Sequence, residues 1–290
     1  MKPTGGACCV LAADEGFFDQ AKACVGTLVR ARAAAGVAAD IVLFDLGLGP
    51  AALDWLAHRG VVVRPPDPVV PRFRAGPAHA WAMSCRPFLP RIVPGYEILM
   101  WVDADIRFLA PGGLAAFLRN AADPGAAIAI VPEADPAYPV IADPVSAATW
   151  QNERTTRLTA VYGADTARRL AVMPPCNAGL FAAAAASPVW DAYRRHLEPA
   201  LDAPWDRMRE QDALNVAIHD LPGVARAPTT LNWLCSLRLP WRAPDGSWRH
   251  PHHRGEPIRV AHLTQSDKVV TLNGRRAPYI DHYRAMGLSD

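Results

Sequence analysis

Lysine is nearly absent from this 290-residue chain, since only three of its 30 basic residues are lysine and arginine supplies the rest. The formal net charge is only +2, so the chain lacks the general positive field that nucleic acid or an anionic membrane would attract. It also lacks an apolar run near the roughly 20 residues that cross a bilayer. We therefore expect no nucleic-acid partner and no transmembrane segment, while peripheral membrane contact stays open.

Paired cysteine spacings are also missing. We expect buried free thiols in a reducing compartment, and hence a cytoplasmic protein. The segment Met1–Gly6 agrees, because it leads straight into a strand pattern without a charged region and a cleavage site. A thiol nucleophile at Cys176 is the less favoured alternative, since no basic residue nearby in the sequence would lower its pKa. The six cysteines are Cys8, Cys9, Cys24, Cys85, Cys176 and Cys235.

Strand and helix patterns alternate along the first half of the chain, which predicts an α/β protein with a mainly parallel sheet and helices on both faces. The hydrophobic fraction of 51% and the charged fraction of 20% are ordinary for a globular protein. The predicted strands are Ala7–Ala13, Asp40–Phe44, Val61–Val63 and Ala126–Val131. The predicted helices are Phe18–Ala35, Pro50–His58, Leu114–Asn120 and part of Trp81–Val93.

The second half is less regular. Pro132–Pro144 is rich in Pro, Ala and Asp, and we expect a long loop over a site. Ala243–Glu256 is also expected to be a loop. Its histidines, His250, His252 and His253, favour a solvated segment over a metal site, because no carboxylate lies in a suitable frame. The predicted helices here are Ser146–Tyr162, Asp165–Ala171, Pro188–Leu201 and Arg209–Ile218.

The stretch EILMWVDADIRF, Glu97–Phe108, is the most informative one. Its apolar run predicts a strand that ends in Asp103 and Asp105, whose side chains share one face because they are two residues apart. Two hard oxygen ligands suit Mg²⁺ or Mn²⁺ carrying a diphosphate. The pattern alone is weak, because about one Asp-x-Asp match is expected by chance in such a chain. The alternative is a pair of carboxylates that cap the turn after the strand.

A second pattern favours nicotinamide chemistry. Gly47, Gly49 and Ala52 follow a predicted strand and match the dinucleotide-binding pattern G-x-G-x-x-A. However, Pro50 removes an amide donor that would hold a pyrophosphate, and Asp45 would repel this anion. We interpret the glycines as a turn before a helix, and keep an NAD(P)-dependent oxidoreductase as an alternative function.

Five further segments stand in a fixed order around the acidic pair. The first strand ends in LAADEGFF, and Arg86 lies in SCRPFLPRIVPGY. PCNAGLF and EQDALN come later, and a predicted strand Ile258–His262 is followed by Lys268. With these motifs, the chain resembles glycosyltransferases of the GT-A type, specifically the retaining family 8 enzymes that use nucleotide-sugar donors. The similarity runs from Cys8 to about Val270.

The resemblance implies a single GT-A domain over residues 1–290, with a Rossmann-like, doubly wound mixed sheet. A nucleotide-binding half would span about 1–131, and a half that binds the sugar and the acceptor would span about 132–290. The implied activity is a hexosyltransferase that moves a sugar from a UDP-sugar to an acceptor and retains the anomeric configuration. The sequence identifies neither the sugar nor the acceptor, which is carbohydrate, lipid-linked or of another kind.

The resemblance also implies a metal site. In the family pattern, Asp103, Asp105 and His262 hold Mn²⁺ or Mg²⁺, and Lys268 contacts the donor phosphate. A single histidine is more often structural, but this lysine at the matching spacing is the only one after Lys22.

The same motif departs from the family in two places. Gln265 stands where the family has glycine, and Val269 and Val270 stand where it has Pro-Trp. We therefore expect a differently shaped phosphate loop.

For the nucleotide, the resemblance assigns Ala12 and Asp14 to the uracil edge and Phe17 to stacking beneath the base. A carboxylate accepts a base N–H and an aromatic face supports the ring. A helix cap at Asp14 and a core contact at Phe17 are the structural alternatives. Gly16 replaces an asparagine of the family, so one contact to the ribose or base is missing.

For the sugar, the resemblance assigns Arg86, Asn177, Ala178 and Gly179 to donor binding. Arg86 would hold the aspartates and the sugar. Asn177 offers a donor and an acceptor to sugar hydroxyls, and the two small residues allow a close approach to the backbone. A surface arginine and a plain turn are the alternatives.

EQDALN supplies Glu210, Gln211 and Asp212 at the start of a predicted helix. With Asn177, these residues would face the anomeric carbon, although acidic residues also favour a helix start for electrostatic reasons. The family more often begins this motif with Asp. A sugar nucleotidyltransferase would have a Gly-rich loop with a basic residue after the first strand, and the sequence has no such loop there. A transferase-like binding protein without turnover is the other alternative.

Overall fold

The computed structural model describes residues 6–265, 268–272 and 274–288. Its centre is a seven-stranded sheet of order β3-β2-β1-β4-β7-β6-β8. The strands are β1 (Ala7–Ala13), β2 (Ala39–Asp45), β3 (Val62–Arg64), β4 (Ile98–Val102), β6 (Ile128–Pro132), β7 (Cys176–Ala184) and β8 (Val224–Arg226). The sequence-based prediction of no signal at Met1–Gly6 falls mostly on residues outside this range.

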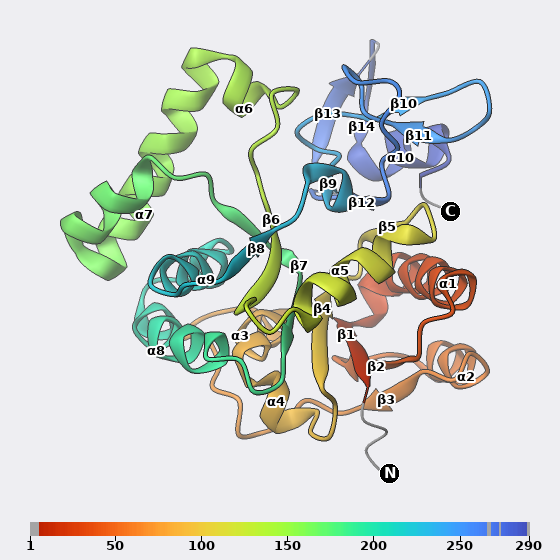
Figure 1. Ribbon diagram of the computed structural model, residues 1–290, viewed down its shortest axis with the longest axis horizontal. Helices are drawn as coiled ribbons and strands as arrows, with labels where there is room; N and C mark the ends of the chain where they lie inside the picture. The colour runs from red at the N-terminus through yellow and green to blue at the C-terminus, as the bar shows by residue number, and fades with distance from the viewer. Residues whose placement is uncertain (1–5, 266–267, 273, 289–290) are drawn as a thin grey trace.

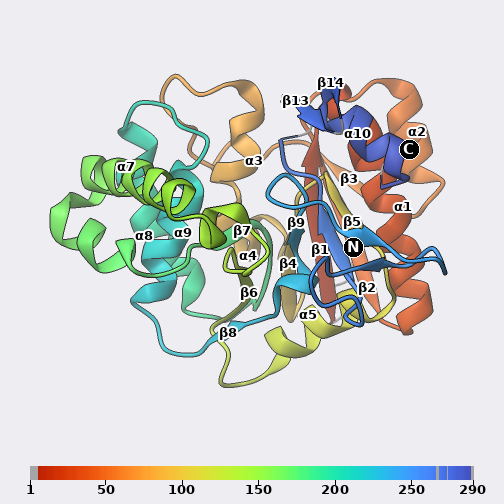
Figure 2. The same cartoon turned by 90° about the horizontal axis from the view of Figure 1, so that it is seen from above.

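Helices cover both faces of the sheet (Figures 1 and 2). The side chains of β1 alternate between them: Cys9 and Leu11 pack with α1, α2 and α5, whereas Cys8 and Val10 pack with α3, α4, α8 and α9. All seven residues of β1 are buried, as is typical of a strand covered on both sides. The helices are α1 (Phe18–Ala35), α2 (Pro50–Ala57), α3 (Trp81–Ser84), α4 (Leu89–Ile92), α5 (Gly112–Ala122), α8 (Val189–Asp202) and α9 (Arg209–His219).

Strand β7 makes the sheet mixed, because it runs antiparallel to both β4 and β6. Its first residues therefore lie beside the last residues of its neighbours, with Cys176 opposite Pro132 and Leu180 opposite Val102. This arrangement brings Asn177, Ala178 and Gly179 to the carboxyl edge of the parallel strands, where open α/β sheets bind ligands.

A small sheet of order β5-β12-β9 extends this edge. Strand β5 (Ile106–Phe108) directly follows the acidic pair, and β12 (Val260–His262) pairs antiparallel with it, so that His262 lies opposite Ile106. Strand β9 (Trp233–Leu234) completes it. The remaining elements of this C-terminal region, in blue in Figure 1, are β10 (Trp241–Arg242), β11 (Trp248–Arg249), β13 (Val269–Leu272), β14 (Arg275–Pro278) and α10 (Tyr279–Met286).

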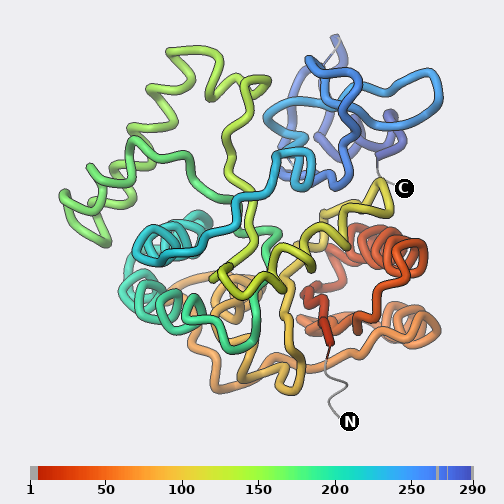
Figure 3. The backbone as a smooth tube through the Cα atoms, in the orientation of Figure 1, coloured from red at the N-terminus to blue at the C-terminus, as the bar shows by residue number. Residues whose placement is uncertain are grey.

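Two loop predictions are wrong in part. Pro132–Pro144 contains a short helix, α6 (Pro139–Ala142), because Pro139 and Pro144 each stand in the first turn of a helix, where no amide donor is needed. Helix α7 (Pro144–Ala171) joins two predicted helices across Gly163, whose φ of 82° breaks the helical geometry. In the tube view, α6 and α7 extend away from the sheet (Figure 3).

The expected solvated loop at Ala243–Glu256 contains β11 and a buried histidine. His250 is 2% exposed and its Nε2 lies 3.0 Å from Asp135 Oδ1. The Thr229 hydroxyl donates to Asp135 Oδ2 at 2.5 Å, and the Ala137 amide donates to Oδ1 at 2.8 Å. A carboxylate far away in the sequence therefore fixes this histidine. The expectation that no carboxylate lies near it was wrong, because the sequence pattern covers only residues that are close in the chain.

Replacement of Asp135 by alanine should lower the free energy of unfolding by about 1–3 kcal/mol, since it orphans three buried hydrogen-bonding groups. Chemical denaturation of the purified protein measures this change. Asp165→Ala is the control, because the exposed Asp165 pairs only with Arg168 on the surface and should change stability by less than about 1 kcal/mol. Equal stability of the two variants would contradict the role of Asp135.

Candidate metal centre and its surroundings

Three ligand-type side chains converge at the carboxyl edge of the sheet. One ligand atom from each of Asp103, Asp105 and His262 lies within 4.8 Å of the others. His262 Nε2 is 3.1 Å from Asp105 Oδ1 and 3.9 Å from Asp103 Oδ2. The side chains of the aspartates are 27% and 12% exposed, so the cluster faces solvent on its carboxylate side. The sequence-predicted ligands therefore come together from β4, the turn after it, and β12.

Asp103 is held in place from behind. Arg86 Nη2 and Trp101 Nε1 both donate to its Oδ1, at 2.6 and 2.7 Å, which leaves Oδ2 toward His262. The Arg86 guanidinium also lies over the Trp101 ring, 4.9 Å from its centroid. Oδ1 of Asp103 is thus engaged in structural hydrogen bonds, and Oδ2 remains available to a ligand.

The charges of this cluster are interdependent. Burial alone would lower the pKa of His262, but Asp105, by charge and hydrogen bond, and Asp103 outweigh it and raise the pKa. For Asp105 the balance is the reverse: burial favours the neutral form, yet His262 and Arg107 together lower its pKa. Burial raises the pKa of Asp103 against the opposing charges of Arg86 and His262. Burial disfavours the charged forms of both carboxylates. A bound cation would stabilise these charges, so the site is suited to one.

The residues present fit a hard divalent ion. Two carboxylates and one imidazole are a ligand set that Mn²⁺ and Mg²⁺ accept. The two carboxylates face His262 Nε2, whereas Nδ1 is buried and has no hydrogen-bond partner among the described residues. The backbone beside the cluster is also shaped for it. A Cβ at Gly179 would stand 2.4 Å from His262 Cε1 and 2.6 Å from Asp103 Oδ2, so only glycine fits there.

Arg86 connects the metal centre to helix α9. Its Nη1 donates to Glu210 Oε2 at 2.5 Å and to the Ala178 carbonyl at 3.1 Å. Glu210 is 2% exposed, and its other oxygen, Oε1, has no hydrogen-bond partner among the described residues. Burial, together with Asp103 and Asp212, raises the pKa of Glu210 to about 8 even though Arg86 opposes this. Arg86 is thus a buried ion-pair centre, not a surface arginine.

Asn177 and Gln211 form a second group of contacts next to the cluster. Asn177 Nδ2 donates to Glu133 Oε1 at 2.9 Å and Gln211 Nε2 donates to the same atom at 3.1 Å. Gln211 Oε1 accepts from the Ala178 amide at 3.0 Å, and Asn177 Oδ1 accepts from the Gly179 amide and from Asn232 Nδ2, each at 3.0 Å.

Asp212 lies apart from this group. It pairs with Arg157 of α7, whose Nε is 3.1 Å from Asp212 Oδ2, and its side chain is 5% exposed. Burial raises its pKa, and Arg157 opposes the shift. Asp212 therefore links α9 to α7.

The residues that the sequence motifs assign to the nucleotide lie at or just after the end of β1. Ala12 is near the end of this strand, which neighbours β4. Asp14 caps the following 3-10 turn by accepting from the Phe17 amide at 2.9 Å, so the capping alternative is realised. Phe17 is 38% exposed and is not part of the core, which leaves its ring open to a ligand.

Lys268 is exposed, and no described contact joins it to the acidic pair. Its amide donates to the Gln265 carbonyl at 2.9 Å, and its own carbonyl accepts from the Tyr279 amide. Gln265 has a φ of 59°, a left-handed conformation that favours glycine. The departure from the family pattern therefore falls on a strained position.

In the glycine turn that the dinucleotide hypothesis requires, the backbone amides already have hydrogen-bond partners. Asp45 Oδ1 accepts from the amides of Gly47 and Leu48 at 2.8 and 2.6 Å, and Glu15 Oε2 accepts from the Gly49 amide at 2.6 Å. These are the donors that a pyrophosphate would need. Two carboxylates thus hold the turn, as expected for a structural element.

Sequence reasoning missed Glu133, Trp101 and Asn232. Glu133 directly follows β6, so its place at the end of a buried strand was a signal that could have been used. Trp101 gave only the signal of a core residue, and Asn232 gave none. The six cysteines are free and buried, and burial raises the pKa of Cys176 to about 12, which argues against a thiol nucleophile.

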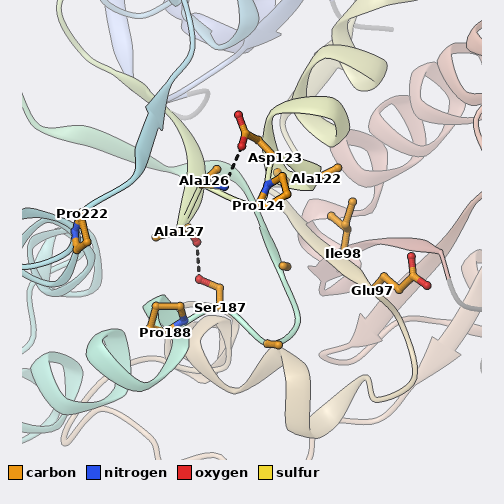
Figure 4. A pocket seen from close by; sticks show the side chains of 14 residues that line it. Glu97, Ile98, Ala122, Asp123, Pro124, Ala126, Ala127, Ser187, Pro188 and Pro222 are labelled. Carbon is orange, nitrogen blue, oxygen red and sulfur yellow. Dashed lines mark hydrogen bonds between the residues drawn. The ribbon is translucent and has the colours of Figure 1, made fainter.

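A separate hollow lies at the opposite edge of the sheet (Figure 4). It is lined by Glu97 and Ile98 at the start of β4, and by Ala-rich and Pro-rich segments around Asp123 and Ser187. The Ser187 hydroxyl is engaged by the Ala127 carbonyl. This hollow has no cluster of ligand-type side chains, and we assign no chemistry to it. None of the described helices is long and apolar enough to cross a bilayer.

No protein-family model matches the sequence, and no curated protein matches it significantly. Solved structures do match the fold. The bifunctional glycosyltransferase WbbM matches 99% of this chain with a TM-score of 0.60 and 13% identity, and this chain spans 50% of WbbM. The galactosyltransferase LgtC, solved with donor and acceptor sugar analogues, matches 97% of this chain and 96% of its own, with a TM-score of 0.57 and 14% identity.

Mouse xyloside xylosyltransferase 1 is a third example, with a TM-score of 0.57, 14% identity, and coverage of 89% of this chain and 96% of its own. At such identities the likeness concerns the fold. The chain has the GT-A glycosyltransferase fold, and the α/β fold class predicted from the sequence is confirmed.

Gly179→Ala should lower the free energy of unfolding by about 1–3 kcal/mol, because the new methyl group overlaps His262 and Asp103. Urea denaturation measures this. Gly255→Ala is the matched control, since a Cβ there meets nothing within 4 Å. An unchanged denaturation midpoint for Gly179→Ala would show that the backbone does not approach the cluster closely.

The raised pKa of Glu210 predicts a pH dependence of stability. The folded protein holds this proton up to about pH 8, whereas an unfolded chain releases it near about 4.3. Stability should therefore fall between these values as pH rises, and Glu210→Gln should flatten the slope. Chemical denaturation from pH 5.5 to 8 tests this, with Glu198→Gln at the exposed surface of α8 as control. Equal slopes in wild type and Glu210→Gln would refute the assignment.

Proposed function

We propose that this protein is a metal-dependent glycosyltransferase that uses a UDP-sugar, a hexose donor in the first instance, and retains the anomeric configuration, as the family 8 resemblance implies. The observation that carries the proposal is the convergence of Asp103, Asp105 and His262 at the ligand-binding edge of a GT-A fold. The structural neighbours support a sugar-transfer function, and the motifs support a UDP donor and the division into a nucleotide half (1–131) and a sugar and acceptor half (132–290).

Asp103, Asp105 and His262 would hold Mn²⁺ or Mg²⁺. When bound, the ion would neutralise charge on the diphosphate as it leaves. Arg86 keeps Asp103 Oδ2 turned toward this site by occupying Oδ1. Lys268, on the turn after β12, would add a positive charge near the phosphates.

The sugar would lie between the metal centre and the start of α9. Glu210 Oε1 is buried and has no partner among the described residues, so a hydrogen bond with a sugar hydroxyl would satisfy it. Ala178 and Gly179 give the sugar access to the backbone. The resemblance also assigns Asn177, Gln211 and Asp212 to this side, where Asp212 would act through its pair with Arg157, and Ala12, Asp14 and Phe17 would bind the uracil.

The compartment and the acceptor are further parts of the proposal. Six free cysteines support a reducing cytoplasm. The acceptor would enter over the segment 132–144 and α6, and peripheral membrane contact is compatible with a lipid-linked acceptor.

Isothermal calorimetry tests the proposal directly. UDP should bind in the presence of Mn²⁺ and not after chelation, and Asp105→Asn should weaken binding by about tenfold or more, because it removes a charged ligand. Asp123→Asn, at the opposite edge of the sheet, should bind like wild type.

The other outcomes separate the alternative functions. Binding of NAD without UDP binding would favour the oxidoreductase. Metal-dependent UDP binding without turnover of any UDP-sugar in a panel would favour a transferase-like binding protein. Failure to bind UDP with either metal would end the proposal.

A further inference from the structure

We infer that Glu133 is a positioning residue of the sugar site: it fixes two carboxamides so that Gln211 presents an N–H donor, and not its carbonyl oxygen, to the bound sugar. This inference rests on the proposed function. It concerns a residue that neither the sequence motifs nor the comparisons assign.

The orientation of the two carboxamides is fixed from the backbone side. An amide side chain looks the same after a flip, so its oxygen is identified by its partners. Gln211 Oε1 lies 3.0 Å from the Ala178 amide, and Asn177 Oδ1 lies 3.0 Å from the Gly179 amide. Since a backbone N–H only donates, the atoms facing Ala178 and Gly179 must be oxygens.

Glu133 fixes the same orientation from the other side. Glu133 Oε1 accepts from both Asn177 Nδ2 and Gln211 Nε2, so the atoms that face it are the amide nitrogens. A flip of either side chain would place two oxygens together and orphan a buried backbone amide. Glu133 is 7% exposed, so water cannot readily replace these bonds.

The donors and acceptors that are already used by protein contacts determine which groups remain to bind a ligand. Asn177 uses both acceptor positions, for Gly179 and Asn232, and both donors, for Glu133 and, at 3.4 Å, Gln211. The expectation that Asn177 bonds directly to sugar hydroxyls therefore gives way to a buried linking role.

Gln211 retains one free group. Its oxygen is shared by Ala178 and Asn177, and one of its two N–H donors binds Glu133. The second N–H has no partner among the residues that the structure describes. The side chain can thus donate to a hydroxyl or ring oxygen of the sugar, and its oxygen is not free to attack the anomeric carbon.

Two substitutions at Glu133 separate its functions. Glu133→Gln keeps an oxygen that can accept the same two bonds, whereas Glu133→Met keeps the size and removes the acceptor. Asp135→Ala is the control, because Asp135 anchors the same segment two residues further on without contacting Asn177 or Gln211.

Each variant is tested with Mn²⁺ for UDP affinity by calorimetry and for hydrolysis of UDP-glucose and UDP-galactose. Glu133→Met should keep UDP affinity within about threefold and lose about tenfold to a hundredfold in kcat/KM, since UDP lacks the sugar that Gln211 contacts. Glu133→Gln should stay within about tenfold of wild type, and Asp135→Ala should keep kcat/KM under conditions where it is folded.

The side-chain amide signals of Asn177 and Gln211 in ¹⁵N NMR give a readout that needs no sugar. They should shift in Glu133→Met and be largely retained in Asp135→Ala. Three results would overturn the inference: amide signals unchanged in Glu133→Met, an equal loss of UDP affinity and kcat/KM, or a loss in Glu133→Gln as large as in Glu133→Met. A wild type that binds no UDP would instead defeat the proposed function, and the NMR comparison would still decide the orientation.

Discussion

The ion pairs of Arg86 are the interaction on which the rest of the site depends. A single guanidinium, 5% exposed, joins Asp103 at the end of β4 to Glu210 at the start of α9. Without this guanidinium the charge of Asp103 would be uncompensated, and the buried Glu210 carboxyl group would lose its hydrogen-bond donor. The same side chain bonds to the Ala178 carbonyl, so that strand, helix and turn are held at one point. Lysine, with a single ammonium group, would not provide this planar set of donors.

The reversed direction of β7 is the second requirement. A parallel strand at this position would bring its carboxyl end, not its first residues, to the ligand edge. Because β7 is antiparallel, Asn177 and Gly179 lie beside Asp103, and the Asp103 amide donates to the Gly179 carbonyl at 2.8 Å. The close contact with His262 then restricts this position to glycine. Topology and a single residue type together determine how closely the candidate metal ligands approach one another.

The sequence predicted best what depends on neighbours in the chain. The bounds of β1 and α1 agree residue for residue, because continuous apolar burial and Gly36 at the helix end are local signals. His262 was placed through motif order alone, since its pairing with β5 is set by the folded sheet. Glu133 and the His250–Asp135 pair were missed because their side-chain partners lie 44 or more residues away. Side chains that supply hydrogen bonds to residues far away in the chain follow no spacing pattern that can be recognised in the sequence.

Saturation of hydrogen bonds also limits how this site can recognise a sugar. Among the described residues Asn177 has no free group left and Gln211 keeps one donor, and the buried oxygens without a partner here are Glu210 Oε1 and Asn232 Oδ1. In the proposed transferase, these rigid polar groups, placed by Arg86 and by buried amides, would discriminate between hydroxyl positions at little cost in entropy. Rigidity of this kind suits the donor sugar. Around α6, by contrast, Ile141 and Val145 are exposed and no comparable network is present among the described residues, so this is the region where the proposed acceptor would bind.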